Sequence, residues 1–191
     1  MLLLKRDDEI RIIQVNSEST ILPYRASFAG AYQTIYSEPP YNERFYPSEA
    51  QATLYHNLQI PENITLLAIK GESQVIGFAL AVPVVHHPEV TRELRGLLSI
   101  KHSFYISELG VLEPYRRKGL AKQFTDLQLK SIPTGKYTQV VLRLSVQQSG
   151  ALHLYQQFGF EDMGVYSEVS ARRTDGMVRT DRRYFLSRLL V

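Results

Sequence analysis

The sequence predicts a mixed α/β fold in which strands and helices alternate along one chain. Apolar residues recur at every second position in some segments and at a spacing of about 3.6 in others. Two neighbouring segments, residues 64–70 and 74–85, are apolar almost throughout, which is typical of central strands covered on both faces. A third apolar run, residues 104–112, leads into a basic turn and then into a helical pattern. Because 191 residues can bury a substantial core, we expect a single domain over residues 1–191.

The first third of the chain predicts one strand and two helices. Residues 9–15 have the pattern of a strand, and residues 20–36 and 47–58 have helical patterns. The segment between the helices, residues 37–43, reads S-E-P-P-Y-N-E and is typical of a turn-rich loop. The two apolar segments that follow form a predicted hairpin around Gly71.

The middle and last thirds continue the alternation. Residues 86–102 are mixed, with a short helix expected at about 89–98, and residues 119–131 form a helix that stops before Pro133. Residues 137–146 alternate as a strand, and residues 149–158 form a short helix closed by Gly159. Two late strands, at roughly 160–169 and 182–190, are joined by a basic loop.

Composition excludes several classes of protein. The chain has no cysteine, which removes disulfides, thiolate metal sites and a cysteine nucleophile, and we expect no metal. Hydrophobic content of 44% and charged content of 21% argue against disorder. A net charge of +3 suits a small polyanion better than a nucleic acid. The first residues become charged too early for a signal peptide and no apolar run could span a bilayer, so no membrane partner and a cytoplasmic location are expected.

The turn P-Y-R-R-K-G-L-A-K, residues 114–122, has the features of an anion-binding site. A glycine lets the backbone approach a ligand closely, and the first turn of a helix carries unpaired N–H groups with a partial positive charge. Arg116, Arg117, Lys118 and Lys122 add cationic side chains. From these residues alone, an ordinary basic surface turn remains an equal alternative.

A second feature is the short helix of residues 149–158. Ala151, Leu154, Tyr155 and Phe158 stand at i, i+3, i+4 and i+7, so they form one apolar stripe that faces the sheet. By spacing alone, Tyr155 is a core tyrosine.

Together, the two segments resemble the GNAT superfamily of acyl-CoA-dependent N-acyltransferases. The turn matches the R/Q-x-x-G-x-G/A motif that cradles the coenzyme A pyrophosphate in that family, and the pattern Q-x-x-A-x-x-L-Y-x-x-x-G-F follows in the correct order. The resemblance covers about residues 64–160. This sequence departs from the family pattern at Gln148, where the family often has asparagine, and at Ala121, where the family often has glycine.

The resemblance implies a fold and a donor site. The fold is a mixed, mostly antiparallel sheet of six to seven strands, flanked by about four helices and splayed at the strands that bind the cofactor. The donor co-substrate is acetyl-CoA. The residues implied to bind it are Leu109, Gly110, Val111, Arg116, Arg117, Lys118, Gly119, Leu120, Ala121, Lys122 and Gln148.

Two residues are candidates for proton transfer. A free amine has a pKa near 10 and must lose a proton before it attacks a thioester. Glu108, a carboxylate in an apolar strand, is the candidate base, and strict alternation places it on one face with Ile106 and Gly110. Two alternatives remain for Glu108. It is a partnered or edge-exposed glutamate without a catalytic role, or it positions the substrate. The resemblance makes Tyr155 the candidate acid for the leaving thiolate, and its phenol is protonated at neutral pH.

The predicted function is transfer of an acetyl group from acetyl-CoA to a primary amine, by direct attack in a ternary complex. The amine belongs to a small molecule, a peptide or a protein. The alternative is a non-catalytic acyl-CoA-binding sensor or regulatory module on the same fold. No nucleic-acid partner is expected, and a basic nucleic-acid-binding domain is a distant third reading. The acceptor, the acyl length and the oligomeric state, a homodimer included, stay open.

Three further groups of residues have an ordinary structural interpretation as well as a functional one. His86 and His87 are loop histidines or parts of the acceptor site. Tyr41 and Tyr46 are packing residues or part of the acceptor pocket. The arginines of the last hairpin form a solvated basic loop, or they attract an acidic acceptor or the coenzyme phosphates: Arg172, Arg173, Arg179, Arg182 and Arg183.

Overall fold

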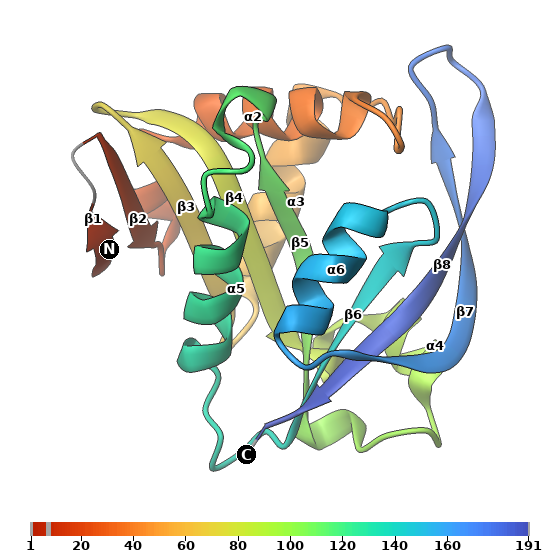
Figure 1. Cartoon of the computed structure of the whole chain (residues 1–191). Helices are drawn as coiled ribbons and strands as arrows, with labels where there is room; N and C mark the ends of the chain where they lie inside the picture. The colour runs from red at the N-terminus through yellow and green to blue at the C-terminus, as the bar shows by residue number, and fades with distance from the viewer. Residues whose placement is uncertain (1, 7–8, 191) are drawn as a thin grey trace.

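The computed structural model describes residues 2–6 and 9–190, which form an eight-stranded sheet with helices on both faces (Figure 1). The strand order is β1-β2-β3-β4-β5-β6-β8-β7. All neighbours are antiparallel except β5 and β6, which are parallel. The strands are β1 (Leu2–Arg6), β2 (Ile10–Gln14), β3 (Ile64–Lys70), β4 (Gln74–Pro83), β5 (Ser103–Val111), β6 (Gln139–Ser145), β7 (Glu161–Arg172) and β8 (Val178–Leu189).

The predicted fold class is confirmed, with one strand more than expected. The additional strand is β1, whose five residues are too few to show an alternating pattern. β8 begins four residues earlier than the predicted strand of residues 182–190, because its polar first half pairs with β7 rather than with the core.

Six α-helices are described, where about four were expected: α1 (Glu18–Ile21), α2 (Arg25–Ser37), α3 (Pro47–Gln59), α4 (Pro88–Leu94), α5 (Leu120–Ser131) and α6 (Ser149–Gln157). The predicted helix of residues 20–36 is broken into α1 and α2 around Pro23, which has no N–H group to donate within a helix. Within residues 2–6 and 9–190, the helices are too short or too polar to cross a bilayer.

The helices cover the sheet in two layers, because successive residues of its central strands point to opposite faces. Leu66 and Ala68 of β3 belong to a core shared with α5 and α6, and Leu67 and Ile69 belong to a core shared with α2 and α3. Figure 1 shows α5 and α6 in front of the sheet and α3 behind it. A smaller core lies beneath α4 on the same face as α2.

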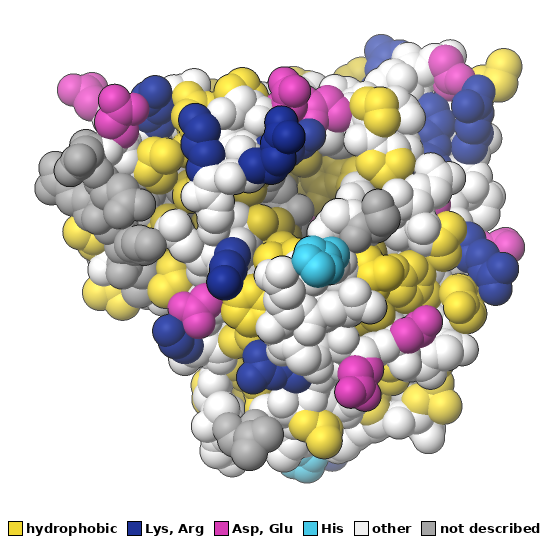
Figure 2. Space-filling model, in the orientation of Figure 1, with side chains coloured by type: hydrophobic (Ala, Val, Ile, Leu, Met, Phe, Trp, Pro, Cys, Tyr) yellow, Lys and Arg dark blue, Asp and Glu magenta, His cyan; other side chains and the backbone are white. Residues whose placement is uncertain are grey.

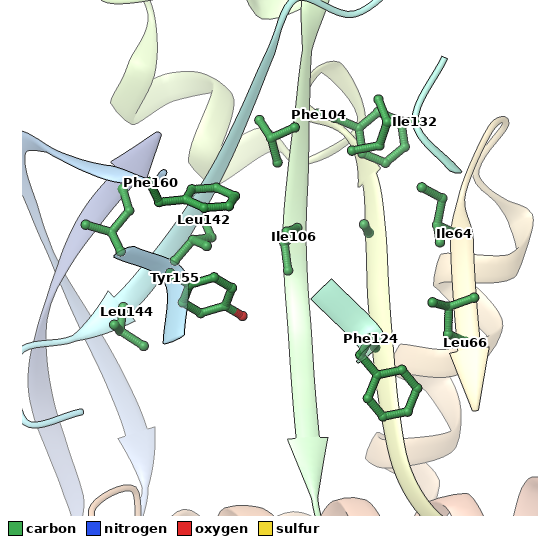
Figure 3. Packing of buried hydrophobic residues seen from close by; sticks show 14 of the residues in the cluster. Ile64, Leu66, Phe104, Ile106, Phe124, Ile132, Leu142, Leu144, Tyr155 and Phe160 are labelled. Atoms are coloured by element: carbon green, nitrogen blue, oxygen red, sulfur yellow. The ribbon is translucent and has the colours of Figure 1, made fainter. Parts of the chain in front are cut away.

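The parallel pair β5 and β6 separates partway along. Ser103–Ile106 of β5 pairs with Gln139–Leu142 of β6, and no pairing continues beyond these residues in the described chain. Figure 3 shows the two strands diverging, with the ring of Tyr155 beside the gap. The splay implied by the family resemblance is thus present, and one edge of β5 from residue 107 onward has no strand beside it.

A β-bulge at Ser107 changes the face on which the next residues of β5 lie. Ala81 of β4 is opposite Ile106, whereas Leu80, the residue before it, is opposite Glu108, so Ser107 is an extra residue on β5. Ile106 therefore packs with the α5 side and Glu108 faces the α2 side. The prediction that Glu108 shares a face with Ile106 is wrong, because strict alternation does not allow for a bulge.

Candidate active site

The basic turn before α5 presents a row of free backbone amides. Gly119 precedes the helix with φ of 81°, and Arg117 also has a positive φ of 59°. Gln123 makes the first bond of the helix, from its N–H to the Gly119 carbonyl at 3.0 Å. The N–H groups of residues 117–122 find no acceptor among the described residues. Six unpaired amides at the positive end of a helix dipole form a site for an anion.

The basic side chains around this turn do different things. Arg116 donates from Nε to the Val111 carbonyl at 2.8 Å and pairs with Glu38, so its guanidinium braces the turn. Lys118 lies over the ring of Tyr115 at 5.6 Å from the centroid and does not line the cavity described next. Arg117 and Lys122 are exposed and do line that cavity. Figure 2 shows Lys and Arg side chains beside a hollow with hydrophobic walls.

A cavity of about 1090 Å³ occupies the gap between the splayed strands. Its walls include residues of the turn, of β5, β6 and α6, of the loop between α2 and α3, and of β7 and β8. Leu112 donates its N–H to Ile76 of β4 at 2.9 Å, so alternation turns the N–H groups of Leu109 and Val111 toward the edge that β6 has left. The cavity thus has backbone donors on one wall. Gln148, at the start of α6, also lines it.

Glu108 lines the same cavity from the α2 side. Tyr36 donates its hydroxyl to one carboxylate oxygen, and Tyr32 donates to the other at 3.4 Å. The side chain is half-buried, because it faces the cavity rather than bulk water. Desolvation by the surrounding protein raises the pKa of Glu108 to about 7, against the lowering effect of the Tyr36 hydrogen bond and of the Arg183 charge. A carboxyl group with this pKa can take up and release a proton near neutrality.

Gly110 lets α2 come close enough for this contact. A Cβ on Gly110 would lie 2.9 Å from the ring of Phe78 and 3.1 Å from Ile35 of α2. The packing of α2 therefore fills the space that Gly110 leaves beside Glu108. That packing brings the helix carrying Tyr32 and Tyr36 onto the carboxylate.

Tyr155 reaches the cavity from the opposite side of the sheet. Its ring packs in the α5–α6 core, at 5.5 Å from the ring of Phe160, and Figure 3 shows the hydroxyl pointing into the gap between β5 and β6. The hydroxyl has no hydrogen-bond partner in the part of the chain that the structure describes. Burial, together with the nearby Tyr41, Tyr105 and Glu108, raises the pKa of Tyr155 well above its usual value of 10. The phenol is therefore protonated at any physiological pH.

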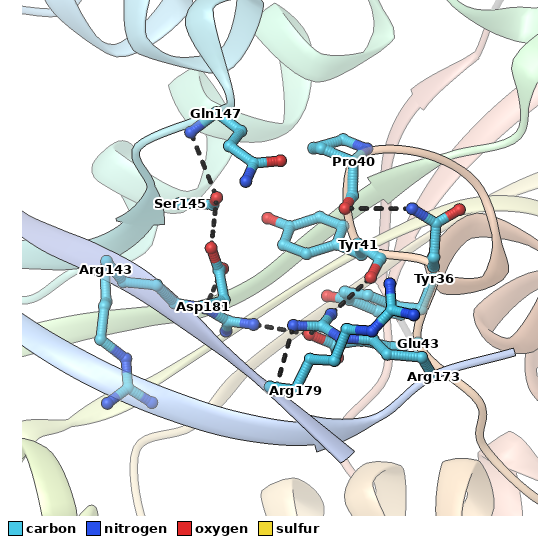
Figure 4. Close-up of polar contacts among 12 residues, drawn as sticks. Tyr36, Pro40, Tyr41, Glu43, Arg143, Ser145, Gln147, Arg173, Arg179 and Asp181 are labelled. Atoms are coloured by element: carbon cyan, nitrogen blue, oxygen red, sulfur yellow. Dashed lines mark hydrogen bonds and ion pairs between the residues drawn. The ribbon is translucent and has the colours of Figure 1, made fainter. Parts of the chain in front are cut away.

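A network of buried and half-buried charges lies beside the cavity, which Glu43 and Arg183 line (Figure 4). Glu43 accepts from Arg183 at 2.7 Å and pairs with Arg173 at 3.4 Å. Arg183 also donates to Asp181 at 3.0 Å, and Asp181 accepts from Ser145 at 3.0 Å. The network joins the loop after α2 to β8 and to the end of β6. For Arg173 and Arg183 the expectation of a solvated loop is wrong, because Arg173 is buried and Arg183 is half-buried. The other arginines of this group are exposed: Arg172, Arg179 and Arg182.

The other candidates, His87, Tyr41 and Tyr46, lie in or beside the cavity. His87 accepts from the Val90 N–H at 3.5 Å and packs edge-on against Tyr105, so it caps α4 while also lining the cavity. Burial is the main cause that lowers the pKa of His87, and the positive charge of Arg143 lowers it further. Tyr41 lines the cavity, and Tyr46 lies at its rim between two arginines.

Sequence reasoning missed three residues of this site, Tyr32, Tyr36 and Glu43. The tyrosines stand four apart in a helical pattern, which is also the pattern of core packing, so they carry no separate signal. Glu43 lies in the turn-rich segment, where a glutamate is ordinarily exposed. Only the pairing of that segment with Arg173 and Arg183, 130 and 140 residues away, shows its role.

Many solved structures share this fold, among them two that match nearly the whole chain. Arabidopsis thaliana NAA60 in complex with acetyl-CoA has a TM-score of 0.63 and 19% identity, over 95% of this chain and 98% of that chain. PH1933 from Pyrococcus horikoshii OT3 has a TM-score of 0.67 and 14% identity, over 96% of this chain and 99% of that chain. Identities this low show the fold alone.

The sequence itself is similar to that of N-acetyltransferases. N-acetyltransferase family 8 member 2 of Rattus norvegicus is 31% identical over 104 residues, which are 54% of this chain and 42% of that protein. The chain spans about two fifths of the length of the curated relatives it matches first.

A model of the acetyltransferase (GNAT) family matches residues 29–160, well over half of the chain. The match begins within α2 and ends just before β7, so it contains the amide-rich turn, the splayed strands and both Glu108 and Tyr155. By the extent of this match, the chain belongs to the acetyltransferase (GNAT) family.

Proposed function

We propose that this protein transfers an acetyl group from acetyl-CoA to a primary amine. The observation that carries the proposal is one cavity lined by an amide-rich turn, by a carboxyl group with a pKa of about 7 and by a protonated phenol. The donor named here is the ligand of the structurally similar NAA60.

The donor side of the cavity fits a thioester with a pyrophosphate. The free N–H groups of residues 117–122 would hold phosphate oxygens, with Arg117 and Lys122 adding charge. The N–H groups of Leu109 and Val111 would face the carbonyl groups of the pantetheine arm and of its thioester. Arg116 supports this surface through Glu38 and the Val111 carbonyl, rather than binding phosphate with its guanidinium.

The two side chains account for the proton movements of a direct transfer. Glu108 takes a proton from the acceptor nitrogen, directly or through a water molecule. The nitrogen lone pair forms a bond to the acetyl carbonyl carbon, and an N–H group on the free edge of β5 stabilises the oxyanion. The nitrogen, which is positively charged after the attack, then loses its second proton to solvent. As the carbon–sulfur bond breaks, its electron pair leaves with sulfur, and Tyr155 supplies a proton to the thiolate. Solvent then returns a proton to Tyr155 and receives the one held by Glu108.

Release of free thiol from acetyl-CoA, in the presence of a panel of primary amines, tests this function. Acetylated amine should appear with the thiol in equal amounts. Glu108→Gln and Tyr155→Phe should each lower turnover by about 10²-fold or more. Glu168→Gln and Tyr166→Phe, which change exposed residues outside the cavity, should leave it unchanged.

Full turnover in both cavity variants would refute the assigned roles. Tight binding of acetyl-CoA with no acetylation of any amine, peptide or protein would refute the enzyme and favour a sensor of acyl-CoA.

A further inference from the structure

The rim of the cavity carries two arginines on one exposed tyrosine. The guanidinium carbon of Arg44 lies 5.5 Å from the centre of the Tyr46 ring, and that of Arg172 lies 5.7 Å from it. All three side chains are exposed, and Arg44 and Arg172 line the cavity. We call Arg44, Tyr46 and Arg172 the cationic rim.

Backbone pairing fixes the cationic rim in place. Arg44 donates its N–H to the Arg172 carbonyl at 2.8 Å, and Glu43 forms an antiparallel bridge with Arg173. The buried ion pairs of Glu43 lie directly behind this bridge. The loop after α2 therefore contacts the end of β7, and the side chains of Arg44 and Arg172 both extend from this contact.

The charges of the cationic rim are not neutralised by the described part of the protein. No carboxylate within residues 2–6 and 9–190 makes an ion pair with Arg44 or Arg172, whereas Arg173 and Arg183 pair with Glu43, and Arg179 pairs with Asp175. The nearby Glu49 accepts the Tyr46 N–H at 2.7 Å as part of the capping of α3. Two like charges held against one ring repel each other, so a bound anion would lower the energy of this arrangement.

We infer that the acceptor carries an anionic group close to its amine, and that the cationic rim binds this group. The inference rests on the proposed function, because it places the amine at Glu108, in the same cavity. Guanidinium groups bind carboxylates with paired hydrogen bonds, so a carboxylate is the expected group. It is supplied either by a small amino acid or by an acidic side chain in a peptide.

Matched acceptors test the inference. One arm compares free amino acids with their amides, and the other compares peptides that carry Asp or Glu at the first, second or third position with the same peptides carrying Asn or Gln. At low salt, the acidic member of a pair should have a KM about 5-fold lower or more, and the difference should shrink at 0.5 M NaCl. The arm that shows the difference identifies the source of the carboxylate.

Variants of the cationic rim give the second readout. Arg44→Gln and Arg172→Gln should each raise KM for the acidic acceptor about 2- to 5-fold, with kcat and KM for acetyl-CoA unchanged. The double variant should reach about 10-fold. Arg182→Gln is the matched control, because Arg182 lies 4.2 Å from the ring of Tyr166 on the same hairpin but does not line the cavity.

Equal KM values for acidic and neutral members of every pair would overturn the inference while leaving the acetyltransferase intact. An effect of Arg182→Gln as large as that of Arg172→Gln would also overturn it, because it would show attraction by overall charge rather than by the cationic rim. If the proposed function itself fails, the neutral acceptors are not acetylated either. This outcome is therefore distinct from a failure of the inference, in which the neutral acceptors are acetylated.

Discussion

Glu108 and Tyr155 line one cavity from opposite faces of the same sheet. Glu108 is held by tyrosines of α2, and Tyr155 packs in the core of α5 and α6. The gap between β5 and β6 is the place where both faces become accessible to one molecule. In the proposed reaction, a proton would be taken from the acceptor on one side of the sheet while another is given to the donor on the other side.

The hydrogen bond from Tyr36 should set the pH at which the enzyme becomes active. Only ionised Glu108 accepts a proton, so kcat/KM should fall as pH drops through about 7. Tyr36→Phe removes a donor to the ionised form, so the pKa of Glu108 and the acidic limb should move to higher pH. Tyr32→Phe should do so less, because its contact is long at 3.4 Å.

The measurement is the pH profile of kcat/KM with one acceptor for all variants, so that titration of the amine is common to them. The other charges that act on Glu108, those of Glu43 and Arg183, are left in place. An unmoved limb in Tyr36→Phe would contradict this assignment.

Glu108→Gln should stabilise the protein at alkaline pH. The folded pKa of about 7 lies above the ordinary 4.5, so the wild-type group contributes stability below pH 4.5 and loses it as pH rises through 7. At about 1.4 kcal/mol per pKa unit the penalty at pH 8 is at most about 3.5 kcal/mol, and cavity water reduces it. Urea unfolding should show a clear gain for the variant at pH 8 and almost none at pH 4.5. An equal gain at both pH values would point to packing instead.

Tyr155→Phe should lower kcat without destabilising the protein. Its hydroxyl lacks a partner in the described chain, so the free energy of unfolding should change by less than about 1 kcal/mol. The KM for acetyl-CoA should stay within about 2-fold, because the ring still packs on Phe160. Thermal unfolding and steady-state kinetics check both statements, and a large loss of stability would mark Tyr155 as a structural residue.

Gly110→Ala should damage the site through α2. The new methyl group would lie 2.9 Å from Phe78 and 3.1 Å from Ile35, and overpacking of this kind costs about 1–3 kcal/mol. Moving α2 away from β5 should also loosen the contact of Tyr36 with Glu108 and reduce kcat. Gly30→Ala on α2 is the control, because a Cβ there has no atom within 4 Å, and it should stabilise the helix by about 1 kcal/mol.

Glu43→Gln should destabilise the protein strongly. It leaves Arg173 and Arg183 without their shared carboxylate in a buried setting, for which a loss of about 3–5 kcal/mol is expected. Asp126→Asn, which breaks the exposed pair with Lys130, should cost less than about 0.5 kcal/mol. Denaturant unfolding of the two variants separates a buried network from a surface pair.

The sequence predicted the local structure of the proposed donor side better than that of the proposed acceptor side, because the donor side is built from contiguous segments. The turn, Gly119 and the stripe that contains Tyr155 lie on contiguous segments whose patterns report their own structure. The acceptor side depends on contacts between distant segments, as between Glu43 and Arg183, and on close packing at Gly110. Contacts of this kind leave no periodic pattern in the sequence. Strict alternation also placed Glu108 on the wrong face, because it does not allow for the bulge at Ser107.

That bulge makes the chemistry of β5 depend on how its residues pair with β4 as much as on their kinds. If Ser107 were instead paired as an ordinary strand residue, Glu108 would lie on the face of Ile106, in the apolar layer beneath α5, and Leu109 would meet the tyrosines of α2. Every side chain could be kept and the base would still be lost. In a natural relative or an engineered chain, the pairing of this strand with its neighbour should therefore be established before a glutamate at this position is assigned a role.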